Sequence, residues 1–398
     1  MRITPTKLAD GRDLIYFDDS EPYASGGATR RLDDPRPLAD RTAPFTDPAT
    51  GATRVPTGPE MRLDRLTGEW IPMASHRMNR TFQPSANACP LCPAQPGSDY
   101  QDGEIPDTSY DVVVFENRFP SYWRLPGQDV SEVWQVDGQS LWPARHAAGR
   151  CEVICFSPGH TDAVAGVSTT RMRTIVEAWA HRTAFLETQE GIATVYPFEN
   201  RGPEIGVTLP HPHGQIYAYP ALPPKTATMA RQAGLYQEAT GGNLFADVVR
   251  AELDAGTRLL AETGHWVAYV PEAARWPVEV HISPRRDVPS LPELTEVEKQ
   301  DFAELYPRLL RGLDHFFVDD AGVPMPLPYI SGWLQAPVDP SLREPWRLHV
   351  QLFSVRRAAN KLKYLAGSES GAGAWISDTT PERIADRARQ ALQEAGEL

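Results

Sequence analysis

The stretches "EVICFSPGH" (residues 152–160) and "EVHISPRR" (279–286) are two versions of one pattern, a β-rich run that ends in Ser-Pro. A second pair follows in the same order, "HGQIY" (213–217) and "HVQLF" (349–353). Segments that recur in a fixed order indicate an internal duplication, which determines the architecture. We therefore predict the same strand–strand–helix–strand unit twice, at about 60–220 and 260–360.

Each Ser-Pro run precedes an amphipathic segment. In the first copy Met172, Ile175 and Trp179 keep the helical spacing of apolar residues. In the second, Thr295 and Glu298 have the spacing of a capping box ahead of an apolar helical stripe. A helix is therefore predicted between the second and third strands of each unit.

These elements predict an α+β protein whose two related halves share a mostly antiparallel sheet flanked by helices. Residues 1–60 are rich in Pro, Asp, Gly and Thr and are predicted to be an extended N-terminal arm. Residues 61–225 form the N-terminal half in this division, and residues 226–398 form the C-terminal half. The first half contains His-Pro-His-Gly-Gln where the second keeps only His349 and Gln351, so we expect the first to be catalytic.

Composition narrows the function classes. The 398 residues include Lys+Arg 39 against Asp+Glu 52, a formal net charge of −13, which disfavours nucleic acid and anionic membranes as partners. No apolar run is long enough for a transmembrane helix, and the first residues lack the apolar core of a signal peptide. The chain has four cysteines, too few for a disulfide scaffold of this size, so a reducing cytoplasm is predicted.

The segment "TLPHPHGQIYAYP" (208–220) is the strongest candidate for chemistry. If 208–219 is a strand, His211, His213 and Gln215 share one face. A neutral imidazole is a good nucleophile for phosphorus, because its reference pKa is about 6.5 and it also leaves readily from a phosphoramidate. A glutamine two residues on can donate a hydrogen bond to phosphoryl oxygens.

A metal site is predicted from "CPLC", in which Cys89 and Cys92 form a Cys-x-x-Cys pair. No second such pair follows, so any further ligands must be histidines, and His160 and His211 are the candidates. Two sulfur and two nitrogen ligands suit a closed, structural zinc site. Cys151 and Cys155 lie in a β-rich run and are interpreted as core residues.

Other polar residues are weaker candidates when each is considered alone. Arg77 and Arg80 follow a predicted short strand, and arginine suits bidentate phosphate binding. Phe-Glu-Asn occurs at both 115–117 and 198–200, so Asn117 and Asn200 could present amides to a base or ribose. Solvated arginines and structural asparagines are the alternative in each case.

Taken together, these motifs resemble those of the galactose-1-phosphate uridylyltransferase family, a branch of the histidine-triad superfamily. The resemblance runs over roughly residues 60–385 through "LTGEW", "CPLC", "FENRFP", "VICFSPGH", "HPHGQIYA", "GHWVAYVP" and "KYLAGSE". It implies duplicated histidine-triad-like units. Gln215 stands where ordinary histidine-triad hydrolases have a third histidine, which makes the signature specific.

The resemblance implies a nucleotidyltransferase of galactose metabolism that works by a ping-pong mechanism. His213 would attack UDP-glucose, release glucose 1-phosphate and form a uridylyl-histidine, from which galactose 1-phosphate would take the uridylyl group to give UDP-galactose. Gln215 would bind the phosphoryl group. The residues implied in substrate binding are Arg77, Arg80, Asn117, Asn200, Gly206 and Thr208 for the nucleotide, and Lys363, Tyr364, Ala366, Ser368 and Glu369 for the hexose phosphate, the latter from the other subunit of a homodimer. Cys89, Cys92, His160 and His211 match the family's zinc ligands.

The sequence also departs from the family pattern. Some members have a second metal site, often iron, made by one Glu and three His. The matching positions here are Met229, Leu334, His349 and Gln351, so we predict that the iron site is absent. Ser368 replaces a tyrosine common in the family, and Trp375 lies near a position where the family usually has a glutamine. These differences leave the sugar specificity undetermined.

Three readings of the function remain. The leading one is a uridylyltransferase for hexose 1-phosphates, with galactose 1-phosphate or a different sugar 1-phosphate as acceptor. The second is a histidine-triad nucleotide hydrolase or phosphorylase, against which Gln215 and the duplication argue. The third is a nucleotide- or zinc-binding regulatory module, which would bind ligand without turnover.

Overall fold

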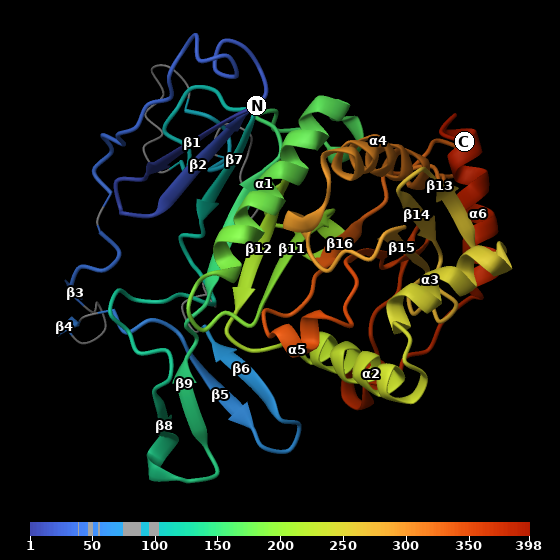
Figure 1. The fold of residues 1–398 in the computed structure, drawn as a ribbon. Coiled ribbons are helices and arrows are strands. Elements are labelled where there is room, and N and C mark those ends of the chain that lie inside the picture. The colour runs from blue at the N-terminus through green and yellow to red at the C-terminus, as the bar shows by residue number, and fades with distance from the viewer. Residues whose placement is uncertain (39, 47–50, 55, 75–88, 95–102) are drawn as a thin grey trace.

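The computed structural model describes residues 1–38, 40–46, 51–54, 56–74, 89–94 and 103–398. It confirms the predicted α+β class: one large twisted sheet with helices packed on it (Figure 1). Every strand pairing described is antiparallel. In spatial order the sheet contains β1 (Arg2–Lys7), β2 (Asp13–Asp18), β7 (Val112–Glu116), β10 (Arg150–Cys155), β12 (His213–Tyr219), β11 (Thr194–Arg201), β16 (Tyr329–Leu334), β17 (His349–Ser354), β15 (Val278–Pro284), β14 (Trp266–Tyr269) and β13 (Leu259–Glu262).

The duplication is visible in this order. β7, β10, β12 and β11 of the first half are matched in reverse by β16, β17, β15 and β14 of the second, and the halves meet where β11 pairs with β16. Gln215 pairs with Phe198, Phe198 with Gly332, and Gly332 with Gln351. The glutamines of the two copies therefore lie in one row across the sheet, related by an approximate two-fold axis at the junction.

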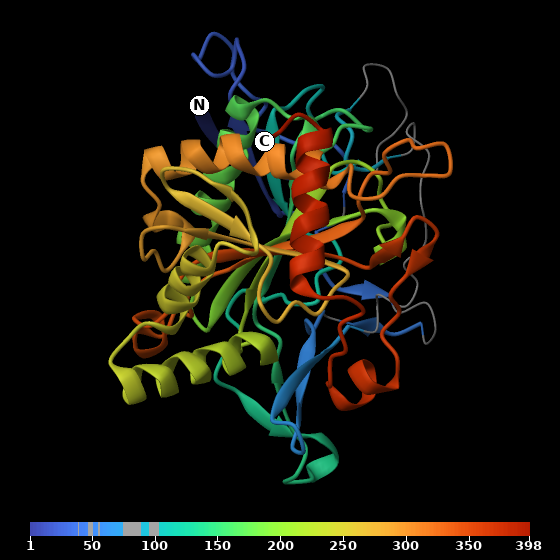
Figure 2. The ribbon, with the colours of Figure 1, turned by 90° about the vertical axis from the view of Figure 1, so that its right-hand side faces the viewer.

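The helices cover both faces of the sheet. Their bounds are α1 (Thr169–Glu187), α2 (Pro224–Thr240), α3 (Leu244–Ala255), α4 (Glu296–Leu313), α5 (Pro340–Arg343) and α6 (Pro381–Glu394). The helices predicted in each unit are α1 and α4, and the Thr295–Glu298 capping box of α4 is present. These two pack side by side on one face, and α6 lies against α4 (Figure 2). On the other face, α2 and α3 cover part of the C-terminal half.

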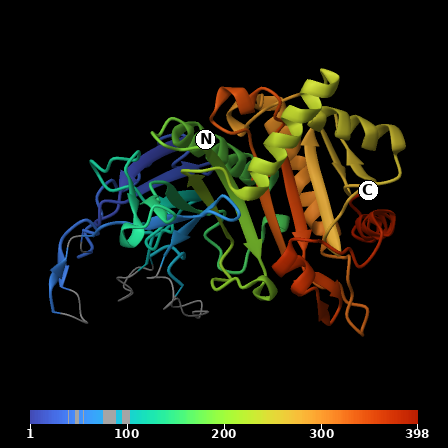
Figure 3. The same ribbon diagram turned by 90° about the horizontal axis from the view of Figure 1, so that it is seen from below.

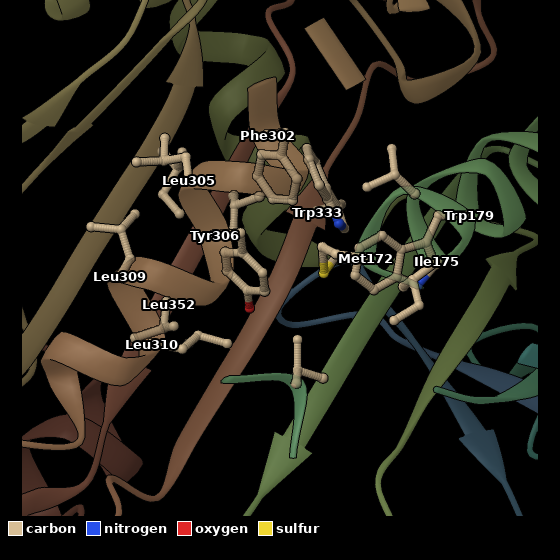
Figure 4. Close-up of a cluster of buried hydrophobic side chains, with 14 of the residues drawn as sticks. Met172, Ile175, Trp179, Phe302, Leu305, Tyr306, Leu309, Leu310, Trp333 and Leu352 are labelled. Atoms are coloured by element: carbon tan, nitrogen blue, oxygen red, sulfur yellow. The ribbon is translucent and has the colours of Figure 1, made fainter. Parts of the chain in front are cut away.

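The main core lies between the sheet and the α1–α4 layer (Figure 4). Trp333 of β16 contacts Trp179 of α1 at a ring distance of 5.9 Å and Phe302 of α4 at 4.7 Å. One side chain thus joins the helical layers of both halves, which makes the core continuous.

The predicted N-terminal arm contributes regular structure. β1 and β2 form a hairpin that pairs with β7 and so extends the large sheet at one edge. A separate smaller sheet contains β6 (Glu69–Met73), β5 (Glu60–Asp64), β9 (Pro143–His146) and β8 (Val133–Gln135). Figure 3 places the N-terminal elements and the C-terminal elements at opposite ends of the molecule.

Short strand pairs complete the fold: β3 (Phe45–Thr46) with β4 (Thr53–Arg54), and β18 (Arg356–Ala358) with β19 (Lys361–Leu362). Among the residues that the structure describes, no helix has both the length and the apolar character needed to span a bilayer.

Candidate active site and metal site

The histidine segment enters the sheet later than the sequence predicts. The strand is β12, His213–Tyr219, and the expected start at Thr208 is wrong. Pro210 and Pro212 lack the N–H that a ladder requires, which explains the delay. His211 therefore does not share a strand face with His213 but lies in the preceding bend, where it is 1% exposed. His213 and Gln215 do share one face of β12.

A backbone hydrogen bond fixes the tautomer of His213. Its Nδ1 lies 2.7 Å from the carbonyl oxygen of His211. Because a carbonyl can only accept, Nδ1 must carry the proton, and the lone pair of the neutral ring is then on Nε2. Nε2 is consequently the nucleophilic atom of this imidazole.

His213 lies on a cavity of about 360 Å³. The cavity is lined by Thr161, Asp162, Ala163, Glu199, Asn200, Arg201, Gly202, Pro203, Val207, Leu209, Pro210, His211, Pro212 and His213. Asn200 follows the Glu199–Gly214 pair of β11 and β12, so it stands beside His213 on the same face. The structure thus brings together two predicted site residues, His213 and Asn200, at one opening.

Gln215 lies two residues after His213 in β12, between Val153 of β10 and Phe198 of β11. Its Oε1 is buried and has no hydrogen-bond partner among the described residues. A buried polar atom without a partner is uncommon in native proteins. A phosphoryl oxygen can only accept a hydrogen bond, so the predicted role would use the donor Nε2 of this amide, and the unpartnered Oε1 does not itself test that role.

Glu199 is a residue of this cavity that the sequence analysis did not single out. It is 6% exposed, and the hydroxyl of Tyr329 donates to its Oε2 at 2.9 Å. Burial raises the pKa of Glu199 to about 7. The repeated Phe-Glu-Asn motif contains Glu199 and is the signal in the sequence that points to it.

The four predicted metal ligands converge. One ligand atom from each of Cys89, Cys92, His160 and His211 lies within 4.8 Å of the others. The Sγ of Cys92 is 3.5 Å from Nδ1 of His160 and 3.5 Å from Nδ1 of His211. The two cysteines come from the loop before β7, His160 from the turn after β10, and His211 from the bend before β12. Cys151 and Cys155 are both fully buried in the core, as predicted.

Surrounding groups orient His211 for coordination through Nδ1. Its Nε2 is 2.8 Å from the carbonyl oxygen of Ser157 and 2.7 Å from the hydroxyl of Tyr110. The Ser157 carbonyl requires a proton on Nε2, which leaves the lone pair on Nδ1, facing Cys92. Burial lowers the pKa of His211 to about 4, so the ring is neutral, as a ligand must be. Neither Tyr110 nor Ser157 stands out in the sequence.

This donor set fits zinc. With Zn–S near 2.3 Å and Zn–N near 2.0–2.1 Å, a tetrahedral ion places sulfur and nitrogen ligands about 3.5 Å apart, the separation seen between Cys92 and both imidazoles. Burial and the neighbouring Cys89 raise the pKa of Cys92 to about 12, so its thiolate needs a cation beside it. These residues can hold a metal ion, with no position left for substrate.

The second half contains a closed counterpart of the histidine site. Nδ1 of His349 lies 3.0 Å from the carbonyl oxygen of Arg347, as Nδ1 of His213 does from His211. Its Nε2, however, is 3.1 Å from Nε2 of Gln351, and the ring is 6% exposed against Phe245. The local geometry is repeated, but the nucleophilic atom is occupied.

Two positions of the predicted missing iron site are apolar and packed. Leu334 and Met229 contact Trp346 and Ala230 in a hydrophobic cluster under α2. Thioether and aliphatic side chains here replace the hard ligands that such an ion prefers. The absence of iron stays a prediction.

The other predicted nucleotide contacts are distributed. Arg77 and Arg80 lie outside the described residues. Asn117 is buried after β7, and its Oδ1 accepts from the backbone N–H of Phe119 at 2.8 Å. Gly206 has φ of 82°, a left-handed conformation suited to glycine, and Thr208 is exposed in the loop that leads to His211.

The predicted hexose-phosphate segment forms a structure of its own. Lys363 is buried, with Nζ 3.2 Å from Asp378 and 3.7 Å from Glu369. Ser368 donates to the carbonyl of Ala374 at 2.7 Å. Tyr364 is 79% exposed, and Ala366 is exposed. Among the described residues that line the His213 cavity, none belongs to this segment.

Comparison with known proteins agrees with this geometry. The family description "Galactose-1-phosphate uridyl transferase, N-terminal domain" matches residues 51–223, and its C-terminal counterpart matches residues 229–396. The chain belongs to the galactose-1-phosphate uridylyltransferase family. It is thereby a member of a family of nucleotidyltransferases, as its motifs predict.

Individual relatives support the family assignment. A galactose-1-phosphate uridylyltransferase of Streptomyces lividans is 39% identical over 98% of this chain and 98% of its own length. One from Thermotoga maritima is 33% identical over 83% of this chain and 98% of its own. A solved uridylyltransferase structure superposes with a TM-score of 0.72 at 33% identity, covering 84% of this chain and 99% of that one.

Proposed function

We propose that this member of the family transfers the uridylyl group of UDP-glucose to galactose 1-phosphate by a ping-pong mechanism through His213. The products are glucose 1-phosphate and UDP-galactose. The observation that supports this most directly is the His211 carbonyl, which holds the proton on Nδ1 and leaves Nε2 of His213 nucleophilic.

In the first half-reaction, the Nε2 lone pair of His213 forms a bond to the α-phosphorus of UDP-glucose. The bond from that phosphorus to the bridging oxygen breaks, and glucose 1-phosphate leaves with the bonding electrons. The Nδ1 proton stays in its bond to His211, which stabilises the positive charge that develops on the ring. The amide of Gln215 binds the non-bridging phosphoryl oxygens.

In the second half-reaction, a phosphate oxygen of galactose 1-phosphate attacks the same phosphorus, and the N–P bond breaks to restore the neutral imidazole. Asn200 lines the cavity beside His213 and is assigned to the nucleotide. Asn117, Gly206, Thr208, Arg77 and Arg80 are assigned to it by their match with the family motif. We assign Lys363, Tyr364, Ala366, Ser368 and Glu369 to the hexose phosphate.

We propose zinc as the ion at Cys89, Cys92, His160 and His211, with a structural role. A bound zinc would fix the bend that contains His211, and His211 holds the proton of His213. No second ion is expected, because Met229 and Leu334 pack in an apolar cluster. Elemental analysis of purified protein should give zinc at about one ion per chain and negligible iron.

We further propose a cytoplasmic homodimer. None of the four cysteines is in a disulfide, which suits a reducing compartment. Tyr364, Leu365 and Ile376 are exposed by 79%, 40% and 57%. An exposed apolar group beside the hexose-phosphate segment suits delivery of that segment to a second copy. Sedimentation velocity measures the oligomeric state.

An exchange assay tests the reaction. The protein is incubated with UDP-glucose and isotopically labelled glucose 1-phosphate, without any acceptor sugar. A ping-pong enzyme incorporates label into UDP-glucose, because the first half-reaction is reversible. Label that enters only when galactose 1-phosphate is present contradicts the mechanism.

The same assay distinguishes the other function classes. Release of free UMP at the rate of UDP-glucose consumption identifies a hydrolase, and tight binding without exchange identifies a regulatory module. A panel of sugar 1-phosphates as acceptors then establishes the sugar. Galactose 1-phosphate should give the highest kcat/KM.

A further inference from the structure

We infer that the N-terminal segment 1–38 is a clamp that holds the metal site and, through it, the nucleophile. Arginines from this segment bind the loop Gly103–Asp111. That loop contacts His211 and the segment between Cys89 and Cys92. The inference rests on the proposed metal and on the proposed role of His213. It assigns a positioning role to a part of the chain that precedes the matched family domains, which begin at residue 51.

The segment reaches the loop at three points. Nη2 of Arg12 is 2.6 Å from Oε2 of Glu104. Nη1 of Arg30 donates to the carbonyl of Ser109 at 2.7 Å and lies 3.2 Å from Asp107. Arg36 donates to the carbonyl of Gly103. These contacts join residues that lie 67 to 92 positions apart in the sequence. At the other end of the loop, the backbone N–H of Asp19 donates to Oδ2 of Asp111 at 2.9 Å.

The clamp is buried. The side chains of Arg12 and Arg30 are 1% and 2% exposed. Arg30 also pairs with Asp18 at 2.6 Å and lies over the ring of Tyr23 at 3.6 Å. Removal of one partner from a buried ion pair leaves an uncompensated charge, so these contacts respond strongly to substitution. A solvated surface arm would show no such pairs.

The loop in turn holds the metal ligands. The N–H of Glu104 donates to the carbonyl of Pro90, between the two cysteines, at 2.7 Å. The hydroxyl of Tyr110 lies 2.9 Å from the carbonyl of Leu91 and 2.7 Å from Nε2 of His211. One loop therefore contacts both the segment between the two cysteine ligands and a histidine ligand.

The last link reaches the chemistry, because the carbonyl of His211 accepts the Nδ1 proton of His213. The contacts therefore run from the N-terminal segment to the loop Gly103–Asp111, from the loop to the metal ligands, and from the ligand His211 to the nucleophile His213. Groups that orient metal ligands commonly change metal affinity by about 10- to 100-fold when removed. The N-terminal segment contacts these orienting groups rather than the ligands, and its contacts should therefore slow the release of the metal.

Zinc release measures this directly. Zinc-loaded wild type and variants are mixed with an excess of a chromogenic chelator under native conditions, and the release rate is recorded. Asp107→Asn removes the loop-side charge while keeping the Arg30–Asp18 pair, and Arg36→Ala removes a less buried contact. We expect release at least about 10-fold faster in both. Arg31→Ala is the matched control, because the Arg31 side chain is 51% exposed and its ion pair among the described residues is with Asp33 at 3.7 Å.

Hydrogen exchange provides the second readout. Amides of residues 103–111 should exchange faster in Asp107→Asn and Arg36→Ala, while those of α4 stay at the wild-type rate. A role in general stability would instead raise exchange across the molecule. If both variants have the wild-type rates of zinc release and amide hydrogen exchange, the clamp is overturned, even if uridylyl transfer is intact. Wild-type protein that binds no zinc overturns both the proposed metal and the clamp. Wild-type protein that retains zinc but does not incorporate label into UDP-glucose refutes only the proposed reaction.

Discussion

His213 and His349 occupy equivalent positions in the two halves, yet their surroundings give them different chemistry. Both donate Nδ1–H to the carbonyl two residues before them. Burial lowers the pKa of His349 to about 3, and Gln351 occupies its Nε2, so this ring is a neutral structural group. His213 instead lines a cavity. Under the proposed mechanism, the two copies therefore differ in the access that a substrate has to the ring.

Glu199 should make stability depend on pH. Its pKa is raised from 4.5 to about 7, so the unfolded chain ionises first as pH rises. The free energy of unfolding therefore falls between about pH 4.5 and 7, by up to about 3 kcal/mol. Glu199→Gln should abolish that fall. Urea denaturation at pH 5.5 and 8 measures it, and equal pH dependence in variant and wild type contradicts the assignment.

Tyr110 should matter to the metal through one hydroxyl. Tyr110→Phe removes the contact to Nε2 of His211 and keeps the ring packing. We expect zinc affinity to fall by about 10-fold, with fold and melting temperature of the zinc-loaded protein nearly unchanged. Competition with a chelator of known affinity measures this. Tyr122→Phe, a tyrosine remote from the metal ligands, is a control that should retain wild-type affinity.

At the residue scale, local motifs predict the metal ligands and the nucleophile, but they do not predict the residues that contact these groups. Cys89, Cys92 and His213 belong to local motifs, so spacing reveals them. Tyr110 and Glu199 act through contacts across the fold, and nothing in their local sequence records the partner. Arg30 is likewise an ordinary residue of a polar stretch until its buried pairs with Asp18 and Asp107 are seen.

The elements follow local patterns where those patterns are strong. α1 and α4 were predictable from apolar spacing and from the Thr295–Glu298 box. β12 begins at His213 because Pro212 interrupts the ladder before it, and a two-residue alternation rule ignores that effect. The sequence does not predict the hairpin of β1 and β2, because the composition of residues 1–60, rich in Pro and Asp, is typical of an extended arm. The two strands are short, and β2 pairs with the edge of β7, a contact that the local sequence does not specify.

Gly214 tests how closely β12 is packed. An added Cβ would lie 2.7 Å from the carbonyl oxygen of Phe198 and 2.8 Å from the ring of Phe156. Gly214→Ala should therefore destabilise the protein by about 1–3 kcal/mol and lower the exchange rate, because β12 must shift. Urea midpoints and the exchange assay measure both. Gly234→Ala is the control, because its added Cβ would meet no atom within 4 Å. It should leave the exchange rate unchanged, and it should raise the free energy of unfolding by about 0.5–1 kcal/mol, because Gly234 lies inside α2.

The whole molecule is a duplicated unit folded into one sheet. The halves meet at the β11–β16 pair and share a core in which Trp333 contacts groups from both. The repeats predicted this symmetry, but not that the halves would share a single core. That property depends on which residues face the junction, and short sequence matches do not specify it.

We therefore expect the two halves to unfold together. Trp333 is 3% exposed, and Trp333→Ala should reduce the free energy of unfolding by about 3–5 kcal/mol for the whole chain. Fluorescence and circular dichroism should report one shared transition. If the variant separates into two transitions, with one half retaining wild-type stability, the core is not shared.

The covalent intermediate is the central claim, and intact mass spectrometry after incubation with UDP-glucose alone tests it most directly. The wild type should gain one uridylyl group per chain, His213→Ala should gain none, and His349→Gln, altered at the closed counterpart, should still gain one. Folded wild-type protein that exchanges label without any adduct, or an adduct that survives in His213→Ala, would contradict the mechanism.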